Sequence, residues 1–115
     1  MRGIQQNRAP VPPLSADERR ENLRKAAAAR ARRSRILDNV RSGALGVSEV
    51  FTMADAGDID VRRTRVFTLL RSVPGFGFAK AQRLMRNLGI SESRRVQGLG
   101  HNQRALILEE IGRAS

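Results

Sequence analysis

The chain contains no cysteine, tryptophan or tyrosine, and among its 115 residues there are four phenylalanines and one histidine, His101. Without cysteine it can form no disulfide, and it offers neither a thiol nucleophile nor a thiolate metal ligand. A single histidine does not make a zinc site. The acidic residues are scattered, with no pair of carboxylates placed to act on a shared substrate. We therefore expect a protein that is not an enzyme and that requires no cofactor.

Long apolar runs are also missing. No stretch of about 18 apolar residues could span a bilayer, and the N-terminus lacks the continuous apolar segment of a signal peptide. The scarcity of aromatic residues argues against a helix that lies on a membrane surface. We expect a cytoplasmic protein with no membrane partner.

Positive charge is what the chain has in excess. Lysine and arginine together number 22 against 11 acidic residues, a net charge of +11. All of these cations are arginines except Lys25 and Lys80. The planar guanidinium pairs bidentately with phosphate and with guanine. Nucleic acid is therefore the expected partner.

The charge divides the chain into two parts. Residues 1–46 hold eleven cations and four anions, and residues 47–115 hold eleven and seven. Three prolines within positions 10–13 restrict the backbone and remove amide donors. We predict a flexible, proline-rich arm over residues 1–14.

A long helix is predicted over residues 15–42. Ser15 and Glu18 have the spacing of a capping box at its start, and Gly43 follows its end. The first two-thirds offer little to bury apart from alanines and Leu23. We expect packing to anchor only the last apolar side chains, which are Ile36, Leu37 and Val40.

This helix is strongly basic, and its cations point in nearly every direction. Acidic residues stop at Glu21 and resume at Asp38, so we expect the cations between them to lack local partners. A run of charge can simply be a solvated helix face, but a basic stripe of this kind favours contact with nucleic acid. The candidate contact residues are Arg19, Arg20, Arg24, Arg30, Arg32 and Arg33.

Residues 47–115 are predicted to form a small all-α domain without strands. Apolar residues recur at helical spacing in three stretches. About 70 residues give a small core, so these side chains are expected to be core rather than ligand contacts. The three stretches are Val47, Val50, Phe51 and Ala54; Val66, Leu69, Leu70 and Val73; and Ala81, Leu84, Met85 and Leu88.

Two glycine-containing turns separate the last helices of this domain. Pro74–Gly77 predicts a tight turn that leads into a helix with Lys80 in its first turn. Glycine lets the backbone come close to a phosphate, and a helix start presents unpaired amides. The alternative is a purely structural turn. The second turn, at residues 98–100, follows a short helical turn at 91–96 and precedes a helix over 102–111.

Several separated motifs, in the same order, resemble the actinobacterial integration host factor family. They are Pro13–Ser15 with the helix segment 25–30, the stretch 66–70, the turn and helix start at 74–82, and residues 93–100. The resemblance implies a long basic N-terminal helix joined to a domain with a helix-two-turns-helix motif. It further implies a nucleoid-associated protein that binds duplex DNA largely independently of sequence, bends or compacts it, and assists a phage integrase or recombinase in site-specific recombination. We expect a monomer in the free state.

The resemblance also assigns roles to positions. The amides of Gly75 and Gly77 and the side chains of Lys80, Arg94 and Arg95 would grip phosphates or enter a minor groove. Neighbouring polar and basic residues complete the predicted surface of the domain, and they are Arg83, Gln97 and Asn102.

Three positions depart from the family pattern. Phe78 and Gln97 stand where members commonly carry lysine and arginine, and His101 where a capping acid is expected. We therefore expect a divergent paralogue or a phage-borne copy. Phe78 is either a wedge against DNA sugars or an additional core residue, and we favour the core.

Two other functions are compatible with the sequence. A similar two-turn motif occurs in a small-subunit ribosomal protein, so a structural RNA-binding protein is the main alternative, and duplex RNA needs no aromatic stacking. A base-excision enzyme with Lys80 as nucleophile is a weaker alternative, because the chain is short for a base-flipping pocket.

Overall fold

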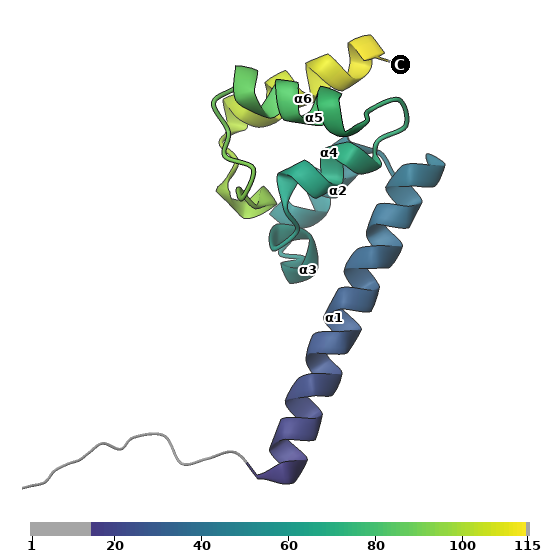
Figure 1. Cartoon of the computed structure of the whole chain (residues 1–115), viewed down its shortest axis with the longest axis vertical. Coiled ribbons are helices and arrows are strands. Elements are labelled where there is room, and N and C mark those ends of the chain that lie inside the picture. The colour runs from purple at the N-terminus through teal and green to yellow at the C-terminus, as the bar shows by residue number, and fades with distance from the viewer. Residues whose placement is uncertain (1–14, 115) are drawn as a thin grey trace, which may run out of the picture. The chain divides into compact units, whose positions relative to one another are not determined.

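The computed structural model of the protein describes residues 15–114, and Figure 1 shows that they fold into helices. The predicted arm over residues 1–14 lies outside the described residues. The all-α class and the long N-terminal helix are confirmed. In chain order the elements are α1 (Ala16–Ser42), α2 (Val47–Asp55), α3 (Ile59–Arg62), α4 (Val66–Ser72), α5 (Phe78–Asn87), the 3-10 turn η1 (Val96–Gly98) and α6 (His101–Ala114).

Helix α1 begins and ends where its sequence predicts. The Ser15 amide donates to Glu18 Oε1 over 3.1 Å, and the Glu18 amide donates to Ser15 Oγ over 3.0 Å, so the capping box is confirmed. Hydrogen bonding to Ser15 lowers the pKa of Glu18. The bond to the Ser15 backbone has the larger effect, and the bond to its side chain has the smaller one. Gly43 follows the helix with φ +85°, a conformation that glycine adopts without steric cost.

The described residues divide into two units, residues 15–30 and residues 31–114. In the first unit, no side chain of residues 15–30 is buried, and Leu23 is 69% exposed. The second unit includes the end of α1, where Ile36 and Val40 are buried. The division predicted from the sequence at residues 42–47 stays a prediction. The two units reflect which residues contact one another and do not show which part of the chain folds on its own.

The core of the unit 31–114 uses the three apolar stretches. Helix α2 packs against α3 and α6, and α4 packs against α5. Every predicted side chain in the three stretches is buried apart from Leu88, which packs at the edge of the core. Leu69, Leu70 and Met85 are among the largest fully buried side chains. Burying the apolar faces of these short helices against one another is what stabilises each of them.

Helix α3 was not predicted from the sequence. Helix α3 is a single turn whose Val61 is fully buried. Asp58 precedes it, and its Oδ1 accepts a hydrogen bond from the Val61 amide over 3.3 Å. An aspartate just before an apolar residue is a helix-start signal. The last helix also runs further than expected, from His101 to Ala114 instead of 102–111.

The segments before α4 and η1 are joined by backbone hydrogen bonds. The Val66 amide donates to the carbonyl of Arg94 over 2.9 Å, and the Val96 amide donates to that of Thr64, also over 2.9 Å. These two bonds make an isolated antiparallel bridge, and no strand is present among residues 15–114. The bridge brings arginines from distant positions in the sequence next to each other.

Candidate nucleic-acid interface

The predicted tight turn leads directly into α5. Gly75 has φ +83°, and the buried ring of Phe76 holds the turn on the core. Gly77 is the N-cap of α5 and offers no side-chain cap, and residues 77–80 are exposed. The first amides of a helix have no partner within the helix. The start of α5 therefore presents backbone N–H groups to the surface.

Gly77 has no evident reason within the chain to be a glycine. Its φ of −92° and ψ of −174° are extended backbone that any residue adopts. A Cβ added to it would meet no atom within 4 Å, so no internal contact excludes a side chain. Glycine is also used where another molecule approaches the backbone closely. This position is suited to an external partner at the turn.

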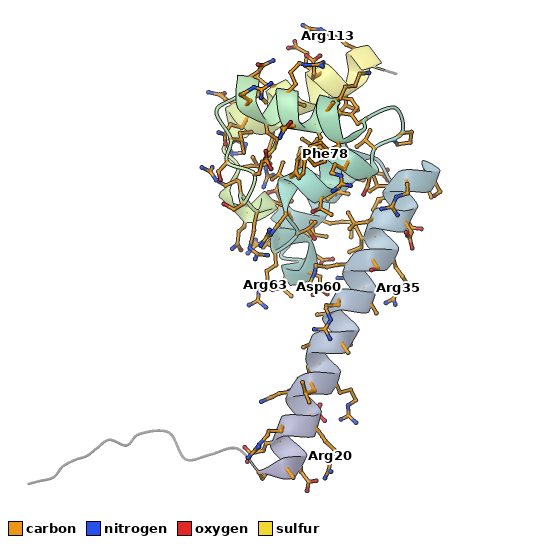
Figure 2. All side chains as sticks on the ribbon, in the orientation of Figure 1. Arg20, Arg35, Asp60, Arg63, Phe78 and Arg113 are labelled. Atoms are coloured by element: carbon orange, nitrogen blue, oxygen red, sulfur yellow. The ribbon has the colours of Figure 1, made fainter. Side chains whose placement is uncertain are left out.

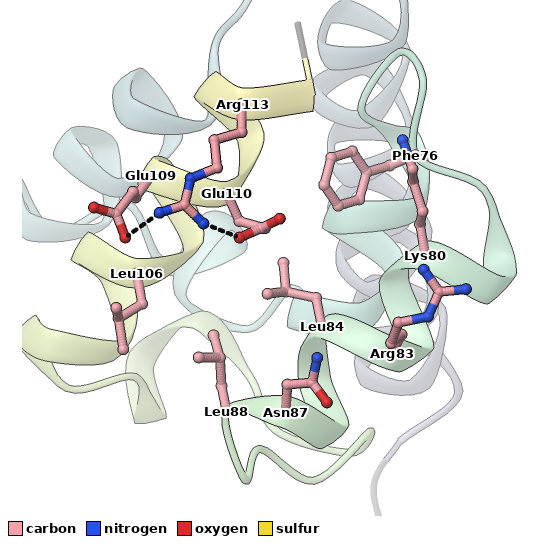
Figure 3. A pocket seen from close by; sticks show the side chains of 10 residues that line it. All are labelled: Phe76, Lys80, Arg83, Leu84, Asn87, Leu88, Leu106, Glu109, Glu110 and Arg113. Carbon is pink, nitrogen blue, oxygen red and sulfur yellow. Dashed lines mark hydrogen bonds and ion pairs between the residues drawn. The ribbon is translucent and has the colours of Figure 1, made fainter.

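Lys80 and Arg83 line a groove of about 420 Å³ between α5 and α6. Figure 3 shows them on the side opposite Glu109 and Glu110. Those two carboxylates pair with Arg113 over 3.6 and 3.1 Å. Lys80 Nζ lies 5.5 Å from the centre of the Phe76 ring. Neither Lys80 nor Arg83 forms an ion pair with any residue in the described part of the chain.

A second basic surface, which we call the arginine cluster, consists of Arg63, Arg65, Arg94 and Arg95. The antiparallel bridge pairs Arg65 with Arg95. Arg95 Nη1 donates to the carbonyl of Arg63, and Arg94 Nη1 donates to that of Gly98 over 2.9 Å. No carboxylate within residues 15–114 pairs with any of the four. Each guanidinium has five N–H donors, so most donors in the cluster stay available.

Two members of this cluster, Arg63 and Arg65, were not among the predicted site residues. The signal was present, because three of the four residues at positions 62–65 are arginine. Neither position belongs to a motif that carried the family resemblance, and their proximity to Arg94 and Arg95 depends on the backbone bridge. Figure 2 shows Arg63 at the end of α3, apart from Phe78 at the start of α5.

The expectation that the cations between Glu21 and Asp38 lack local partners is wrong for Arg24, and Arg32 and Arg33 have partners distant in sequence. Arg24 pairs with Glu21 three residues earlier. Arg32 forms a bidentate pair with Asp58, with both distances 2.7 Å, and also donates to Asp60 over 3.0 Å. These hydrogen bonds raise the pKa of Arg32, and the bond from Arg32 lowers the pKa of Asp58.

Arg32 therefore has a structural role, in which the end of α1 is fastened to the start of α3. Arg33 Nη1 lies 4.0 Å from the Asp60 carboxylate, a weak pair. Arg19, Arg20, Arg24 and Arg30 are exposed on the first half of α1. Arg20 pairs with Asp17, and both side chains are largely exposed. Exposed pairs of this type are weak and readily exchanged for a phosphate.

The remaining predicted site residues lie near the start of α6. Gln97 and Asn102 are exposed, as is His101, the first residue of the helix. The first turn of α6 has no acidic residue. Instead the Gly100 amide donates to Gln103 Oε1 over 3.0 Å. Gln103 thus accepts a hydrogen bond at the start of α6, where the family pattern predicts a capping acid at position 101.

Phe78 is not a core residue, and that prediction is wrong. Its side chain is 52% exposed. Its ring contacts Phe67 of α4 edge to face, with the ring centres 5.3 Å apart. Phe78 is the first residue of α5 and lies outside the core, whereas Ala81 and Met85, further along the same helix, are buried in it.

Comparisons with known proteins agree on one family. A family model described as the S13-like H2TH domain matches residues 40–111. Integration host factor of Streptomyces coelicolor is 40% identical over 102 residues, covering 89% of this chain and 94% of that protein. Integration host factor of Mycobacterium tuberculosis is 36% identical over 104 residues, covering 90% and 98%.

A solved structure agrees with the sequence relatives. The structure of sIHF bound to an 8-bp palindromic DNA is 40% identical with a TM-score of 0.72, and the match covers 77% of this chain and 99% of that one. The predicted family and the helix-two-turns-helix motif are confirmed. The chain belongs to the actinobacterial integration host factor family, whose members are not enzymes.

Proposed function

We propose that this protein is an architectural DNA-binding protein of the nucleoid, which binds duplex DNA largely independently of sequence and bends or compacts it. The observation that carries the proposal is the arginine cluster, four guanidinium groups without a carboxylate partner in the described chain. A relative that is 40% identical over the matched region has been solved bound to DNA. Guanidinium groups and phosphates form strong charge-assisted hydrogen bonds.

Contacts to the DNA backbone explain why little sequence preference is expected. The candidate groups are guanidinium side chains, the Lys80 ammonium and the amides at the start of α5. Phosphates are alike at every base pair, so contacts to them fix position without reading sequence. Arg19, Arg20, Arg24 and Arg30 on the first half of α1 would add a second, separate set of phosphate contacts.

Bending follows from the same contacts. A bent duplex brings more phosphates within reach of a small basic protein. Bending 20–30 base pairs by 40–90° costs about 1–6 kcal/mol, which a few additional charge-assisted contacts offset. A protein that bends DNA in this way would assist a phage integrase or recombinase by bringing distant sites together. In the free state it would be a monomer.

The bending proposal is tested by energy transfer between dyes at the two ends of duplexes about 30 base pairs long. Several unrelated sequences should all show increased transfer when the protein binds. Binding confirmed by anisotropy without any change in transfer would refute bending. The variant Arg63→Ala with Arg65→Ala should reduce the slope of log affinity against log salt by about 0.9 for each phosphate that the protein no longer neutralises.

A further inference from the structure

Phe78 is part of an exposed group of three side chains, the Phe67–Arg71–Phe78 cluster. The two rings meet at 83° with their centres 5.3 Å apart. The Arg71 guanidinium carbon lies 5.6 Å from the centre of the Phe67 ring and 5.4 Å from that of Phe78. The cluster joins α4, which carries Phe67 and Arg71, to the start of α5, where Figure 2 labels Phe78.

The cluster is fixed in place although half of Phe78 faces solvent. Phe67 is partly buried and packs against the core, so it supports the exposed ring from below. Edge-to-face pairs contribute stability beyond the area that they bury, and so does a cation over a ring. The result is an apolar surface with a positive charge over it.

Two groups in the cluster lack a partner suited to their chemistry. About half of the Phe78 ring lies in water, where an apolar surface is costly. The Arg71 guanidinium makes ring contacts, but within residues 15–114 it has neither a hydrogen-bond acceptor nor a carboxylate. Its N–H edges are free to bind an anion. A ligand with an apolar face next to a negative charge would satisfy both groups.

The sugar–phosphate backbone of DNA has this chemistry, because each deoxyribose adjoins a phosphate. Phe78 also directly follows Gly77, where the backbone is open to a partner. We propose that Phe78 packs against deoxyribose in the minor groove while Arg71 binds the adjacent phosphate. This inference rests on the proposed DNA-binding function and adds a contact site to it.

The nearest alternative is that a protein surface or a second copy of this chain covers the cluster, since aromatic residues and arginine are enriched in protein interfaces. Charge favours DNA. The cluster and the adjoining helix start carry Arg71, Lys80 and Arg83 and no carboxylate. A second copy would bring the same excess of positive charge to the contact.

Salt dependence separates the two parts of the proposed contact. Phe78→Ala should weaken DNA binding about 10-fold, because the apolar area that DNA would bury on the exposed half of the ring is lost. The slope of log affinity against log salt should stay unchanged. Arg71→Ala should reduce the slope by about 0.9. The matched control is Thr52→Ala, which truncates an exposed side chain on α2, a helix with none of the proposed contact residues, and should change neither quantity.

A fluorescent substitution tests the contact directly. The chain has no tryptophan, so Phe78→Trp introduces a single indole. Acrylamide should quench it in the free protein and at least about twofold less in the DNA complex, because DNA would cover an exposed ring. Thr52→Trp, on the exposed face of α2, is the control and should stay equally accessible with and without DNA. Thermal melting shows whether each variant is folded.

Three results would contradict the proposal, and they are distinguishable. If the unaltered protein binds DNA while the indole of Phe78→Trp stays accessible, the contact is wrong and the proposed function stands. If the unaltered protein does not bind duplex DNA, the proposed function itself fails. If the indole is already shielded in free protein that sediments as a dimer, a second copy covers the cluster.

Discussion

Two glycines in one turn should respond to the same substitution in opposite ways. Gly75 has φ +83°, which is costly for a residue with a Cβ, whereas Gly77 has an extended backbone that alanine adopts freely. An added Cβ would meet no atom within 4 Å at either position. Gly75→Ala therefore tests the backbone conformation, and Gly77→Ala tests what approaches the turn from outside.

The expected stabilities follow from the backbone angles. A left-handed conformation costs alanine about 1–2 kcal/mol relative to glycine, and a less flexible unfolded chain returns about 0.4–1 kcal/mol. Gly75→Ala should thus lower the free energy of unfolding by about 1 kcal/mol, or the melting temperature by about 4–8 °C. For Gly77→Ala the poorer N-cap and the stiffer unfolded chain should nearly cancel.

Binding should show the opposite order. If a phosphate approaches the Gly77 backbone, a methyl group there holds it away from the amides of α5. A hydrogen bond to a charged group contributes about 1.5–3 kcal/mol, so losing one should weaken DNA binding about 10-fold or more. Calorimetry or thermal melting gives the stability, and anisotropy of a labelled duplex gives the affinity.

The control is an exposed glycine that is not part of the turn. Gly112→Ala in α6 adds a methyl group that meets no atom within 4 Å. It should raise stability by about 0.5–1 kcal/mol, since glycine is unfavourable inside a helix, and leave DNA binding unchanged. If Gly77→Ala binds duplex DNA as tightly as the unaltered protein, the backbone of the turn does not face DNA and this reasoning is refuted.

Three further predictions concern other parts of the chain. Arg94→Ala with Arg95→Ala should weaken DNA binding by about 1–3 kcal/mol and make its salt dependence less steep. Arg113→Ala is the control and should change both quantities little, because Glu109 and Glu110 already pair with this arginine. Equal effects of the two variants would move the site to α6. Asp58→Asn keeps the cap of α3 but loses the ion pair with Arg32, so it should destabilise the protein by about 1 kcal/mol above pH 4. The difference in stability between the two proteins should vanish as the pH falls through the lowered pKa of Asp58. A pH series of thermal melts measures it. Deleting residues 1–30 should leave the rest of the chain folded, because none of the described side chains before residue 31 is buried. The truncated protein should keep its helical circular dichroism and melt cooperatively. Loss of cooperative unfolding would contradict a boundary at residue 30.

Local signals predicted most of the fold. The capping box and Gly43 set the ends of α1 correctly, because both act within a few residues. The apolar spacing identified the buried faces of α2, α4 and α5, because a helix repeats its faces every 3.6 residues. A match of several motifs in order identified the family, which no single motif would have done.

Phe78 shows where spacing fails. It lies three residues before Ala81 and seven before Met85, so it fits the buried stripe of α5. Periodicity gives the direction of a side chain around the helix axis, but not how far the core extends along that axis. As the first residue of the helix, Phe78 lies past that limit, against Phe67.

Partners distant in sequence were the other failure. Arg32 and Asp58 are 26 residues apart, and nothing in either segment indicates the pair. The arginine cluster depends in the same way on the backbone bridge between the segments before α4 and η1. Net charge correctly indicated a basic surface, but it could not distinguish guanidinium groups that stabilise the fold from those that stay available to a ligand.

The central claim is that this protein binds duplex DNA through its backbone. The most direct test is fluorescence anisotropy with DNA and RNA duplexes of matched sequence across a salt series, using the full chain and the chain without residues 1–30. We predict tighter binding to DNA, with a steep salt slope that becomes shallower on truncation. Tighter binding to RNA would contradict this account and would support a structural RNA-binding protein.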